Sequence, residues 1–356
     1  MSNNIFYPIF VNMKNKNFLA VGLIIGSMLI SSFSFYCWQI VYTPNILVDK
    51  EEIIFNIPTG ADFKYVQNSF HDLGIVNDVV SFSFLSKLKR YDESVKSGSY
   101  LIKADMSNND VINMLRSGDQ IPIKLTYSHA RSLQDLAGKI ASYFEFDSVS
   151  MISNLSNSNV ASSFGFTKET FMCMFLPNTY EVYITDQPEA VLNRIYSAYK
   201  TFWNSERTAM AEALNLSPVQ VIILASIVDA ETNHMDEAPS IAGVYINRLN
   251  KNIRLQADPT LVFAMGDFNI KRVLKKHMQI NSPYNTYKYR GLPPGPINIP
   301  SIAAIEAVLN YEKNDYLYFC AKPDFSGKHV FAKTLSQHNK NARLLHLALN
   351  NKKIYK

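Results

Sequence analysis

The sequence has few of the residues from which metal frameworks and disulfide scaffolds are built. Among 356 residues there are three cysteines, Cys37, Cys173 and Cys320, and none belongs to a C-x-x-C pair. An odd number of dispersed cysteines argues against both a zinc framework and a disulfide scaffold. A Cys173–Cys320 disulfide stays open in an oxidising compartment, because spacing alone does not exclude it.

Metal-ligating patterns are equally scarce. Glu231 and His234 form one Glu-x-x-His pair, whereas di-iron bundles use two such pairs on separate helices, and the sequence has no second pair. The H-E-x-x-H pattern of zinc proteases is absent as well. We therefore expect no metal site and no cofactor.

A strong excess of one charge sign is also lacking. The chain has 35 Lys and Arg against 30 Asp and Glu, which gives a formal net charge of +5. This excess is too small for a nucleic-acid-binding protein, which gathers basic side chains in patches. Hydrophobic residues make up 47% of the chain, enough for a folded core, so general disorder is not expected. The length suits about two domains.

One long stretch carries no charge at all. Between Lys16 and Asp49 lies the apolar segment 18–38, which meets the requirement of about 20 apolar residues for a transmembrane helix. Aromatic residues that favour the membrane interface stand at its end, namely Tyr36, Trp38 and Tyr42. A cleaved signal peptide is the alternative, but its apolar core is shorter and small residues follow it.

The charges around this segment predict a topology. We expect a cytoplasmic tail at residues 1–17 and a transmembrane helix at residues 18–41. Lys14 and Lys16 precede the span and no acidic residue does. The positive-inside rule then places the rest of the chain outside the cytoplasm.

Apolar periodicity predicts two folded regions after the span. In residues 50–118, strand-like alternation at 51–58 and 97–104 encloses two segments with helical spacing. This β-α-α-β order suits a small glycan-binding module. Residues 121–356 mix strand and helix patterns, so the predicted fold class is α+β.

Two finer predictions concern the second region. Residues 150–165 are rich in Ser and Asn, which favours a loop. Residues 188–214 have the spacing of one long amphipathic helix.

The segment 214–232 carries the clearest chemical signal. Ser217, Pro218 and Gln220 have the spacing of a helix start with a capping box. The following residues, 221–228, are apolar on every side, so this helix should be buried.

Glu231 stands at the end of this apolar helix. Burial and the negative end of the helix dipole both raise the pKa of a carboxyl group. A carboxyl kept protonated near neutral pH can act as the general acid for a glycosidic oxygen. The alternative is an exposed glutamate just past the helix end, with Asp229 and Thr232 as helix-end decoration. The pattern alone favours neither.

Residues 281–300 form an irregular segment with five prolines, two glycines and three tyrosines. Prolines reduce the entropy that such a loop loses on binding. Tyrosine faces and amide side chains such as Asn285 suit sugar rings and N-acetyl groups. A rigid connector is the alternative interpretation.

Several motifs, taken in order, resemble one known family. They are LASIVDAET at 224–232, AGVYINRL at 242–249, RLQADPT at 254–260 and SPYNTYKYRGLPPGPI at 282–297. With DYLYFCAK and HVFAKTLSQHN nearer the C-terminus, they resemble the endolytic murein transglycosylases, or YceG-like proteins. The resemblance is strongest over residues 170–345. It implies a LysM-like module at 50–118 and a YceG-like catalytic domain at 121–356.

The resemblance also implies a reaction, a substrate and a location. The family makes a lytic cut between MurNAc and GlcNAc within glycan strands, which leaves a 1,6-anhydro-MurNAc end and terminates nascent strands. The implied partners are peptidoglycan glycan strands and the peptidoglycan synthases of the elongation or division machinery. The implied location is the bacterial cytoplasmic membrane, with one span and the catalytic domain on the extracytoplasmic side.

The family's V-E-x-E-T motif carries its catalytic glutamate at the second acidic position. This sequence reads V-D-A-E-T at 228–232, so the role passes to Glu231, and Asp229 departs from the pattern. Asp258 is also a candidate N-cap, and Arg248 a candidate partner for a protein carboxylate. The resemblance implies eight substrate-binding residues: Asn247, Arg248, Gln256, Asp258, Tyr284, Asn285, Thr286 and Tyr287.

Two other functions compete with this hypothesis. A catalytically silent, membrane-anchored scaffold would bind peptidoglycan and recruit partners, and it would keep its role without Glu231. A hydrolase would cut the same polymer but add water to the product. Product mass separates the hydrolase from the lytic enzyme.

Overall fold

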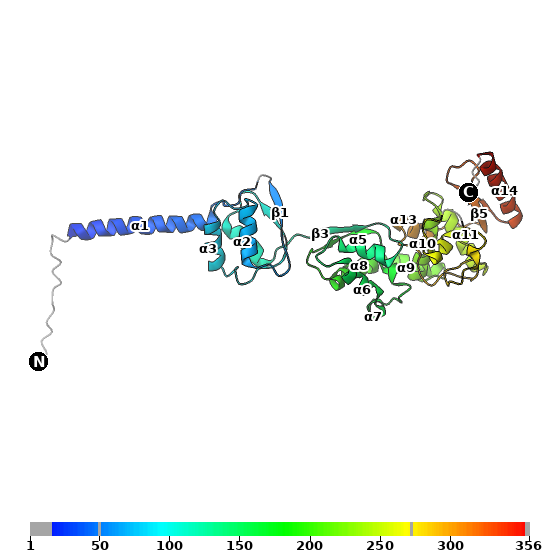
Figure 1. Ribbon diagram of the computed structural model, residues 1–356, viewed down its shortest axis with the longest axis horizontal. Coiled ribbons are helices and arrows are strands. Elements are labelled where there is room, and N and C mark those ends of the chain that lie inside the picture. The colour runs from blue at the N-terminus through cyan, green and yellow to red at the C-terminus, as the bar shows by residue number, and fades with distance from the viewer. Residues whose placement is uncertain (1–15, 49–50, 271–272, 353–356) are drawn as a thin grey trace. The chain divides into compact units, whose positions relative to one another are not determined.

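The computed structural model describes residues 16–48, 51–270 and 273–352. The chain divides into two compact units, residues 1–122 and 123–356, and each has its own hydrophobic core (Figure 1). The secondary structure is mixed α+β, as the sequence predicts. The described strands form three separate two-stranded antiparallel sheets. Packing between helices therefore provides most of the core.

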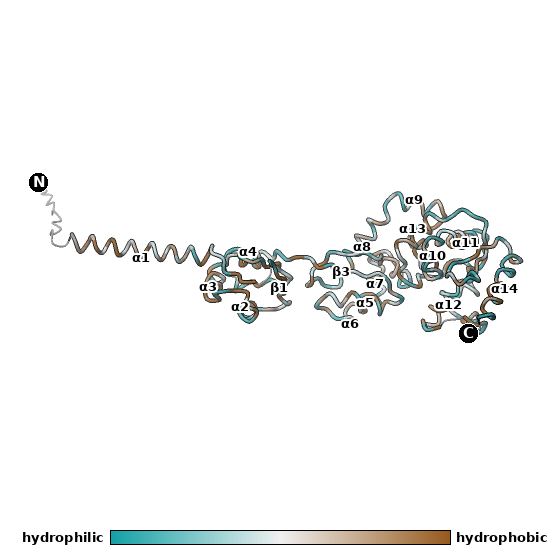
Figure 2. The backbone as a smooth tube through the Cα atoms, turned by 90° about the horizontal axis from the view of Figure 1, so that it is seen from above, coloured by the Kyte–Doolittle hydropathy of each residue, from teal (hydrophilic) through white to brown (hydrophobic). Residues whose placement is uncertain are grey.

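Helix α1 (Lys16–Tyr42) coincides with the uncharged stretch of the sequence. Its segment Phe18–Tyr42 is 25 residues long, has a mean hydropathy of 2.1 and buries none of its apolar window in the protein. Hydrophobic residues, brown in Figure 2, recur along the helix. At about 1.5 Å per residue it is long enough to cross the roughly 30 Å of a bilayer core. A helix of this kind near the N-terminus fits a membrane span and a signal sequence alike.

The rest of the first unit follows the order β-α-α-β-α. Strands β1 and β2 pair antiparallel, with Phe55 opposite Tyr100. Side chains of Asp62, Asp78 and Ser107 cap the three helices by accepting hydrogen bonds from backbone N–H groups. The elements are β1 (Glu52–Ile57), α2 (Phe63–Asp72), α3 (Val79–Leu88), β2 (Gly98–Lys103) and α4 (Asn108–Ser117).

The second unit contains an antiparallel pair of strands that are distant in sequence. Its first part consists of β3 (Ile123–Tyr127), α5 (Leu133–Ala141), α6 (Ser148–Ser156), α7 (Ser158–Ser163), the short 3-10 helix η2 (Phe171–Met174), β4 (Asn178–Val182), α8 (Pro188–Phe202) and α9 (Ser205–Ala213). Strands β3 and β4 pair antiparallel, with Leu125 opposite Tyr180.

Two sequence predictions in this part are wrong. Residues 150–165 are not a loop, because α6 and α7 run through them and bury Met151, Leu155 and Ala161. The single helix predicted over 188–214 is two helices, α8 and α9. Its break lies at Asn204, whose side chain accepts a hydrogen bond from Arg207 N and so caps a new helix start.

The remaining elements surround the C-terminal half of the core. They are α10 (Pro218–Glu231), α11 (Ala238–Asn250), α12 (Asp258–Met265), η3 (His277–Gln279), α13 (Ile302–Leu309), β5 (Tyr318–Ala321), β6 (His329–Ala332) and α14 (Leu335–Asn351). Strands β5 and β6 pair antiparallel, with Phe319 opposite Phe331.

Helix α10 is the central helix of this half. Ser217 and Gln220 form the predicted capping box, and Pro218 occupies the first turn. Residues 221–228 are all buried, because α11 and α13 pack against the helix. A helix that is apolar all round is stable only when it is covered in this way. Its fixed position in the core fixes the residue at its C-terminal end, Glu231.

Cysteine pairing is settled by the structure. Cys173 is buried in the core and Cys320 lies in β5, and both thiols are free, as is that of Cys37. Burial raises the pKa of the Cys173 thiol far above its ordinary value, so this residue acts as a small core side chain.

Candidate active site

Glu231 is the last residue of α10, and its carboxylate is held from a neighbouring helix. The hydroxyl of Tyr245, on α11, donates a hydrogen bond to Oε1 of Glu231 at 2.6 Å. Tyr245 is only 2% exposed, so this carboxylate is the partner that its buried hydroxyl needs. Glu231 itself is half-buried, with one carboxylate oxygen occupied by Tyr245.

The surroundings of Glu231 change its acidity. Burial raises the pKa of Glu231 to about 7, the hydrogen bond from Tyr245 acts to lower it, and the negative charge of Asp258 acts to raise it. Near neutral pH the protonated and ionised forms are therefore both accessible. A group with this property can donate a proton in one step and accept one in the next.

Glu231 and Asp258 both line two cavities. The first has a volume of about 660 Å³ and the second about 410 Å³. The carboxylate thus faces open space in two neighbouring compartments. An arrangement of this kind suits a chain-like ligand that continues past the reacting bond in both directions.

The first cavity combines hydrogen-bond acceptors with apolar walls. Asp229, Asn233 and Asn298 line it beside Glu231 and Asp258. Its other lining residues are mostly apolar or basic, namely Val262, Phe263, Phe268, Ile270, Val273, Ile297, Pro259, Ala230, His129 and Arg131.

Two polar residues of this first cavity also support the fold. Oδ1 of Asp229 accepts hydrogen bonds from Ser301 N at 3.2 Å and Ser301 Oγ at 2.5 Å, at the start of α13. Asn298 is 4% exposed and donates to the carbonyl of Ser226 at 3.2 Å. Within the described residues its Oδ1 has no hydrogen-bond partner.

The second cavity is richer in aromatic and basic side chains. Four of the eight predicted substrate-binding residues line it: Arg248, Gln256, Asp258 and Tyr287. The hydroxyl of Tyr287 donates to Oδ1 of Asp258 at 2.5 Å, and burial raises the pKa of Tyr287 far above its ordinary value. The other lining residues are Glu231, Tyr245, Leu255, Tyr318, Phe319, Cys320, Ala321, His329, Leu335 and His338.

Among the residues that the structure describes, Arg248 pairs with backbone carbonyls and with no carboxylate. It is 7% exposed, and its Nε donates to the carbonyl of Leu317 at 2.6 Å. Its Nη1 donates to the carbonyls of Arg254 and Leu255, both at 3.0 Å. Its guanidinium also lies 5.0 Å from the ring centre of Tyr318. Arg248 therefore ties α11 to the chain before β5 and to the segment that leads into α12.

Asp258 begins α12 but is not its N-cap. The N-cap position falls on Ala257, and no side-chain hydrogen bond caps the helix. Thr286 supports this helix start, because its hydroxyl accepts from Ala257 N at 3.0 Å and contacts the Thr260 hydroxyl at 2.8 Å. Gln256, in a left-handed conformation with φ of 53°, donates its N–H to the carbonyl of Thr286 at 3.1 Å. These bonds position Asp258 at the two cavities.

Four predicted residues line neither cavity: Asn247, Tyr284, Asn285 and Thr286. Asn285 is fully buried and organises its own loop. It donates to the carbonyls of Met278 at 2.9 Å and Ile280 at 2.7 Å, and it accepts from Tyr287 N at 3.0 Å. Its amide is therefore committed to the protein backbone.

Asn247 and Tyr284 are also engaged within the protein. Asn247 donates to the carbonyls of Asn314 at 2.8 Å and Tyr316 at 3.0 Å. The nearby Gly243 admits this segment, since an added Cβ would lie 2.6 Å from a carbonyl oxygen of residue 312. The ring of Tyr284 packs 4.7 Å from that of Phe263, centre to centre.

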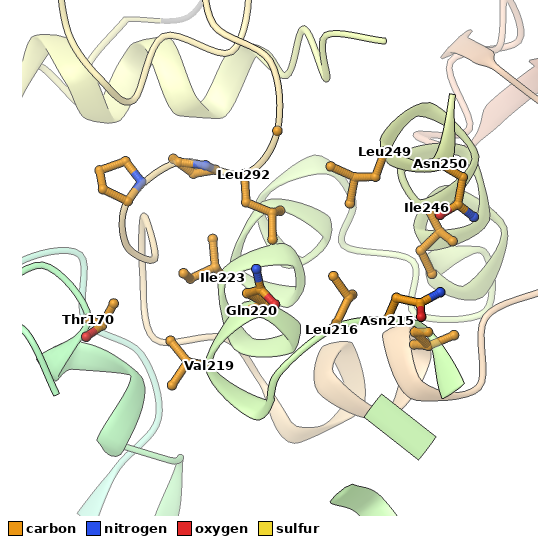
Figure 3. A pocket seen from close by; sticks show the side chains of 14 residues that line it. Thr170, Asn215, Leu216, Val219, Gln220, Ile223, Ile246, Leu249, Asn250 and Leu292 are labelled. Atoms are coloured by element: carbon orange, nitrogen blue, oxygen red, sulfur yellow. The ribbon is translucent and has the colours of Figure 1, made fainter. Parts of the chain in front are cut away.

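A further cavity of about 490 Å³ lies near the N-terminal end of α10 (Figure 3). Val219, Gln220 and Ile223 of α10 face Ile246 and Leu249 of α11 across it. None of its described lining residues has an ionisable side chain. The groups capable of proton transfer are thus at the opposite end of α10.

Within the described ranges, no group of three or more His, Cys, Asp and Glu side chains could hold a metal ion. The His234 ring of the Glu-x-x-His pair lies 3.1 Å from the carbonyl of Ser326.

Sequence reasoning missed Tyr245, Asn298 and His329. The ring of Tyr245 packs in the core, and core packing alone leaves its hydroxyl without a hydrogen-bond partner. A buried tyrosine hydroxyl requires one, and a carboxylate at the end of a neighbouring buried helix is a suitable acceptor. Asn298 and His329 reach the cavities only through tertiary packing, which has no local signal.

Known proteins of one family resemble this chain over most of its length. The YceG-like family matches residues 55–344. A Bacillus subtilis (strain 168) protein named endolytic murein transglycosylase is 29% identical over 309 residues, covering 82% of this chain and 84% of its own length. A protein of the same name from Streptococcus pneumoniae serotype 2 is 25% identical over 355 residues, covering 90% of this chain and 64% of its own length.

A crystal structure of a YceG-like protein from Listeria monocytogenes is also similar. It superposes with a TM-score of 0.56 at 28% identity, and the match covers 82% of this chain and 99% of that one. Because the family match extends over most of the sequence, from residue 55 to residue 344, this chain belongs to the YceG-like family.

Proposed function

We propose that this protein is an endolytic murein transglycosylase, a lytic enzyme whose catalytic acid and base is Glu231. The observation that carries the proposal is the carboxyl group of Glu231, which has a pKa of about 7, faces two cavities and accepts a hydrogen bond from Tyr245. Membership of the YceG-like family and the names of the curated relatives support the same reaction.

One carboxyl group can perform both proton transfers of a lytic cut. Protonated Glu231 donates its proton to the glycosidic oxygen, the bond from that oxygen to C1 of MurNAc breaks, and GlcNAc leaves with a new hydroxyl. The C6 hydroxyl of the same MurNAc forms a bond to C1, and its proton returns to the Glu231 carboxylate. No water is consumed, and the product end is 1,6-anhydro-MurNAc. Because the attack is intramolecular, it benefits from proximity.

Tyr245 determines which carboxylate oxygen of Glu231 exchanges the proton with substrate. Its hydroxyl occupies Oε1 at 2.6 Å, which leaves Oε2 to exchange the proton with substrate. A hydrogen bond to the ionised form also limits how far burial raises the pKa of Glu231. Tyr245 thus keeps the group able to release its proton as well as to hold it.

The two cavities supply room for sugars on each side of the cut. We propose that Gln256, Asp258 and Tyr287 contact the strand, since all three line the cavities beside Glu231. Arg248 contributes mainly by holding the segment that carries Gln256 and Asp258. Asn247, Tyr284, Asn285 and Thr286 support the loops around the cleft from within.

The elements of the first unit bear on where this reaction takes place. We propose that α1 anchors the enzyme in the bacterial cytoplasmic membrane with the catalytic unit outside the cytoplasm, and that residues 50–118 act as a LysM-like glycan-binding module. The apolar length of α1 and the β-α-α-β order support these roles. Such an enzyme would cut strands close to the membrane, where synthases extend them, and would terminate their growth.

The proposal is tested by incubating the full chain, in detergent, with purified glycan strands. The wild-type protein should release soluble fragments, and Glu231→Gln should release none while it still binds strands. Glu212→Gln, an exposed position on α9, is the matched control and should cut like wild type. Cutting by Glu231→Gln would refute the assignment, and strand binding without cutting by wild type would favour the scaffold.

A further inference from the structure

We infer that His329 is a further substrate-contacting residue, whose Nε2 accepts a hydrogen bond from a sugar hydroxyl or amide N–H in the second cavity. The inference rests on the proposed function, because it places a glycan in that cavity. It depends on a chain of contacts that joins β6 to the residue after Glu231 through one buried carboxylate, that of Glu237.

Glu237 is the centre of this chain of contacts. It is 8% exposed and immediately precedes α11. Its Oε1 accepts from the Thr232 hydroxyl at 2.7 Å and lies 2.7 Å from Nδ1 of His329. Its Oε2 accepts from His329 N at 2.9 Å. Burial acts to raise the pKa of Glu237, but the hydrogen bonds from His329 and Thr232 outweigh it, so the pKa is lowered and the group is ionised near neutral pH.

The ionised carboxylate determines the tautomer of His329. A carboxylate only accepts hydrogen bonds, so Nδ1 of His329 must carry a hydrogen. In the neutral ring Nε2 is then an acceptor with its lone pair exposed at the opposite edge. Within the described residues Nε2 has no hydrogen-bond partner, and the side chain is 13% exposed. An acceptor held in this way is available to a donor that enters the cavity.

The ring of His329 is part of the wall beside the catalytic residue. His329, Phe319 and Glu231 all line the 410 Å³ cavity. The ring packs edge-on against Phe319, with centres 5.2 Å apart and planes at 89°, and Phe319 in turn packs edge-on against Tyr245. These contacts restrict rotation of the imidazole, so Nε2 is presented in one direction.

The same carboxylate oxygen links this acceptor to the reacting group. Thr232 follows Glu231 directly, and its hydroxyl shares Oε1 of Glu237 with the His329 ring. The end of α10 and the wall of the cavity are therefore held in a fixed position relative to each other. A sugar that donates to Nε2 would be placed at a defined distance from Glu231, which is how binding at a neighbouring position aids cutting.

A pair of substitutions separates this contact from a purely structural bond. In His329→Asn the amide N–H lies near the place of Nδ1, so the bond to Glu237 is kept and Nε2 is removed. In His329→Gln the amide lies near the place of Nε2, so the cavity contact is kept and the bond to Glu237 is lost. His346→Asn, at an exposed position of α14, is the matched control.

The experiment measures KM, kcat and the thermal unfolding midpoint of each full-length variant with purified glycan strands. Loss of one neutral hydrogen bond lowers kcat/KM by up to about 10-fold. We expect His329→Asn to show this loss, mainly as a higher KM, with an unchanged unfolding midpoint. We expect His329→Gln to unfold at a lower temperature with a KM closer to that of wild type.

Three outcomes would overturn the inference. A wild-type KM for His329→Asn would show that Nε2 contacts no substrate. If the variant with the lower unfolding midpoint also had the higher KM, His329 would serve the fold alone. If wild type neither binds nor cuts glycan strands, the proposed function fails and the inference fails with it, whereas cutting with an unaffected His329→Asn refutes only the inference.

Discussion

Replacing Glu231 by glutamine should make the protein more stable above neutral pH while it removes the catalytic acid. The pKa of Glu231 is raised from 4.5 to about 7 in the folded chain. Between these two values the folded state binds more protons than the unfolded state. Below the unfolded-state pKa, Glu231 therefore makes its full contribution to the free energy of unfolding. This contribution is lost as pH rises through the folded-state pKa.

The magnitude follows from the difference in pKa. One pKa unit corresponds to about 1.4 kcal/mol. Ionisation of Glu231 therefore lowers the free energy of unfolding by about 3 kcal/mol at pH 8 and by less than about 1 kcal/mol at pH 5. Glutamine does not ionise, and its carbonyl oxygen can still accept the hydrogen bond from Tyr245. Relative to wild type, the free energy of unfolding of Glu231→Gln should then rise by about 2 kcal/mol more at pH 8 than at pH 5.

Denaturant unfolding of the wild type and the variant at the two pH values measures this difference. Glu212→Gln, on the exposed face of α9, serves as the control and should change stability equally at both pH values. A Glu231→Gln stability gain that is absent, or equal at pH 5 and pH 8, would refute the raised pKa. The argument that Glu231 carries a proton near neutral pH would then fail as well.

Further predictions concern the hydroxyl of Tyr245, the support of α12 and helix α1. Tyr245→Phe removes the hydrogen bond that lowers the pKa of Glu231, so kcat/KM should stay high to a higher pH than in wild type; an unmoved or lower upper limit of the pH profile would contradict this. Thr286→Val leaves the buried N–H of Ala257 unpaired and should cost about 1–3 kcal/mol of stability by denaturant unfolding, with reduced activity; a neutral result would show that the bond does not hold the helix start. The full-length protein should stay in the membrane fraction until detergent is added, whereas a shortened soluble mature form would identify α1 as a cleaved signal sequence.

Local signals in the sequence were sufficient for the elements that lie nearest the chemistry. The capping box at Ser217 and Gln220 and the apolar run after it predict α10 correctly, because both determinants are local. Glu231 then falls at the helix end by counting residues. Its hydrogen bond to Tyr245 depends on how α10 and α11 pack, and spacing does not reveal this.

Two expectations drawn from composition depended on tertiary packing, which composition does not reveal. Residues 150–165 have polar composition, yet Met151 and Leu155 are covered by the core, and tertiary burial stabilises α6 despite weak propensity. In the loop at 281–300, composition alone does not distinguish an amide that faces a ligand from one that faces the backbone. Asn285 has the second role, because four backbone groups surround its side chain.

The mass of the products of glycan cleavage tests the central claim most directly. Purified strands would be incubated with the wild-type protein and with Glu231→Gln, and the fragments weighed by mass spectrometry. We predict fragments with 1,6-anhydro-MurNAc ends from wild type and none from the variant. Fragments heavier by one water would contradict the lytic mechanism and identify a hydrolase, and anhydro fragments from Glu231→Gln would contradict the role of Glu231.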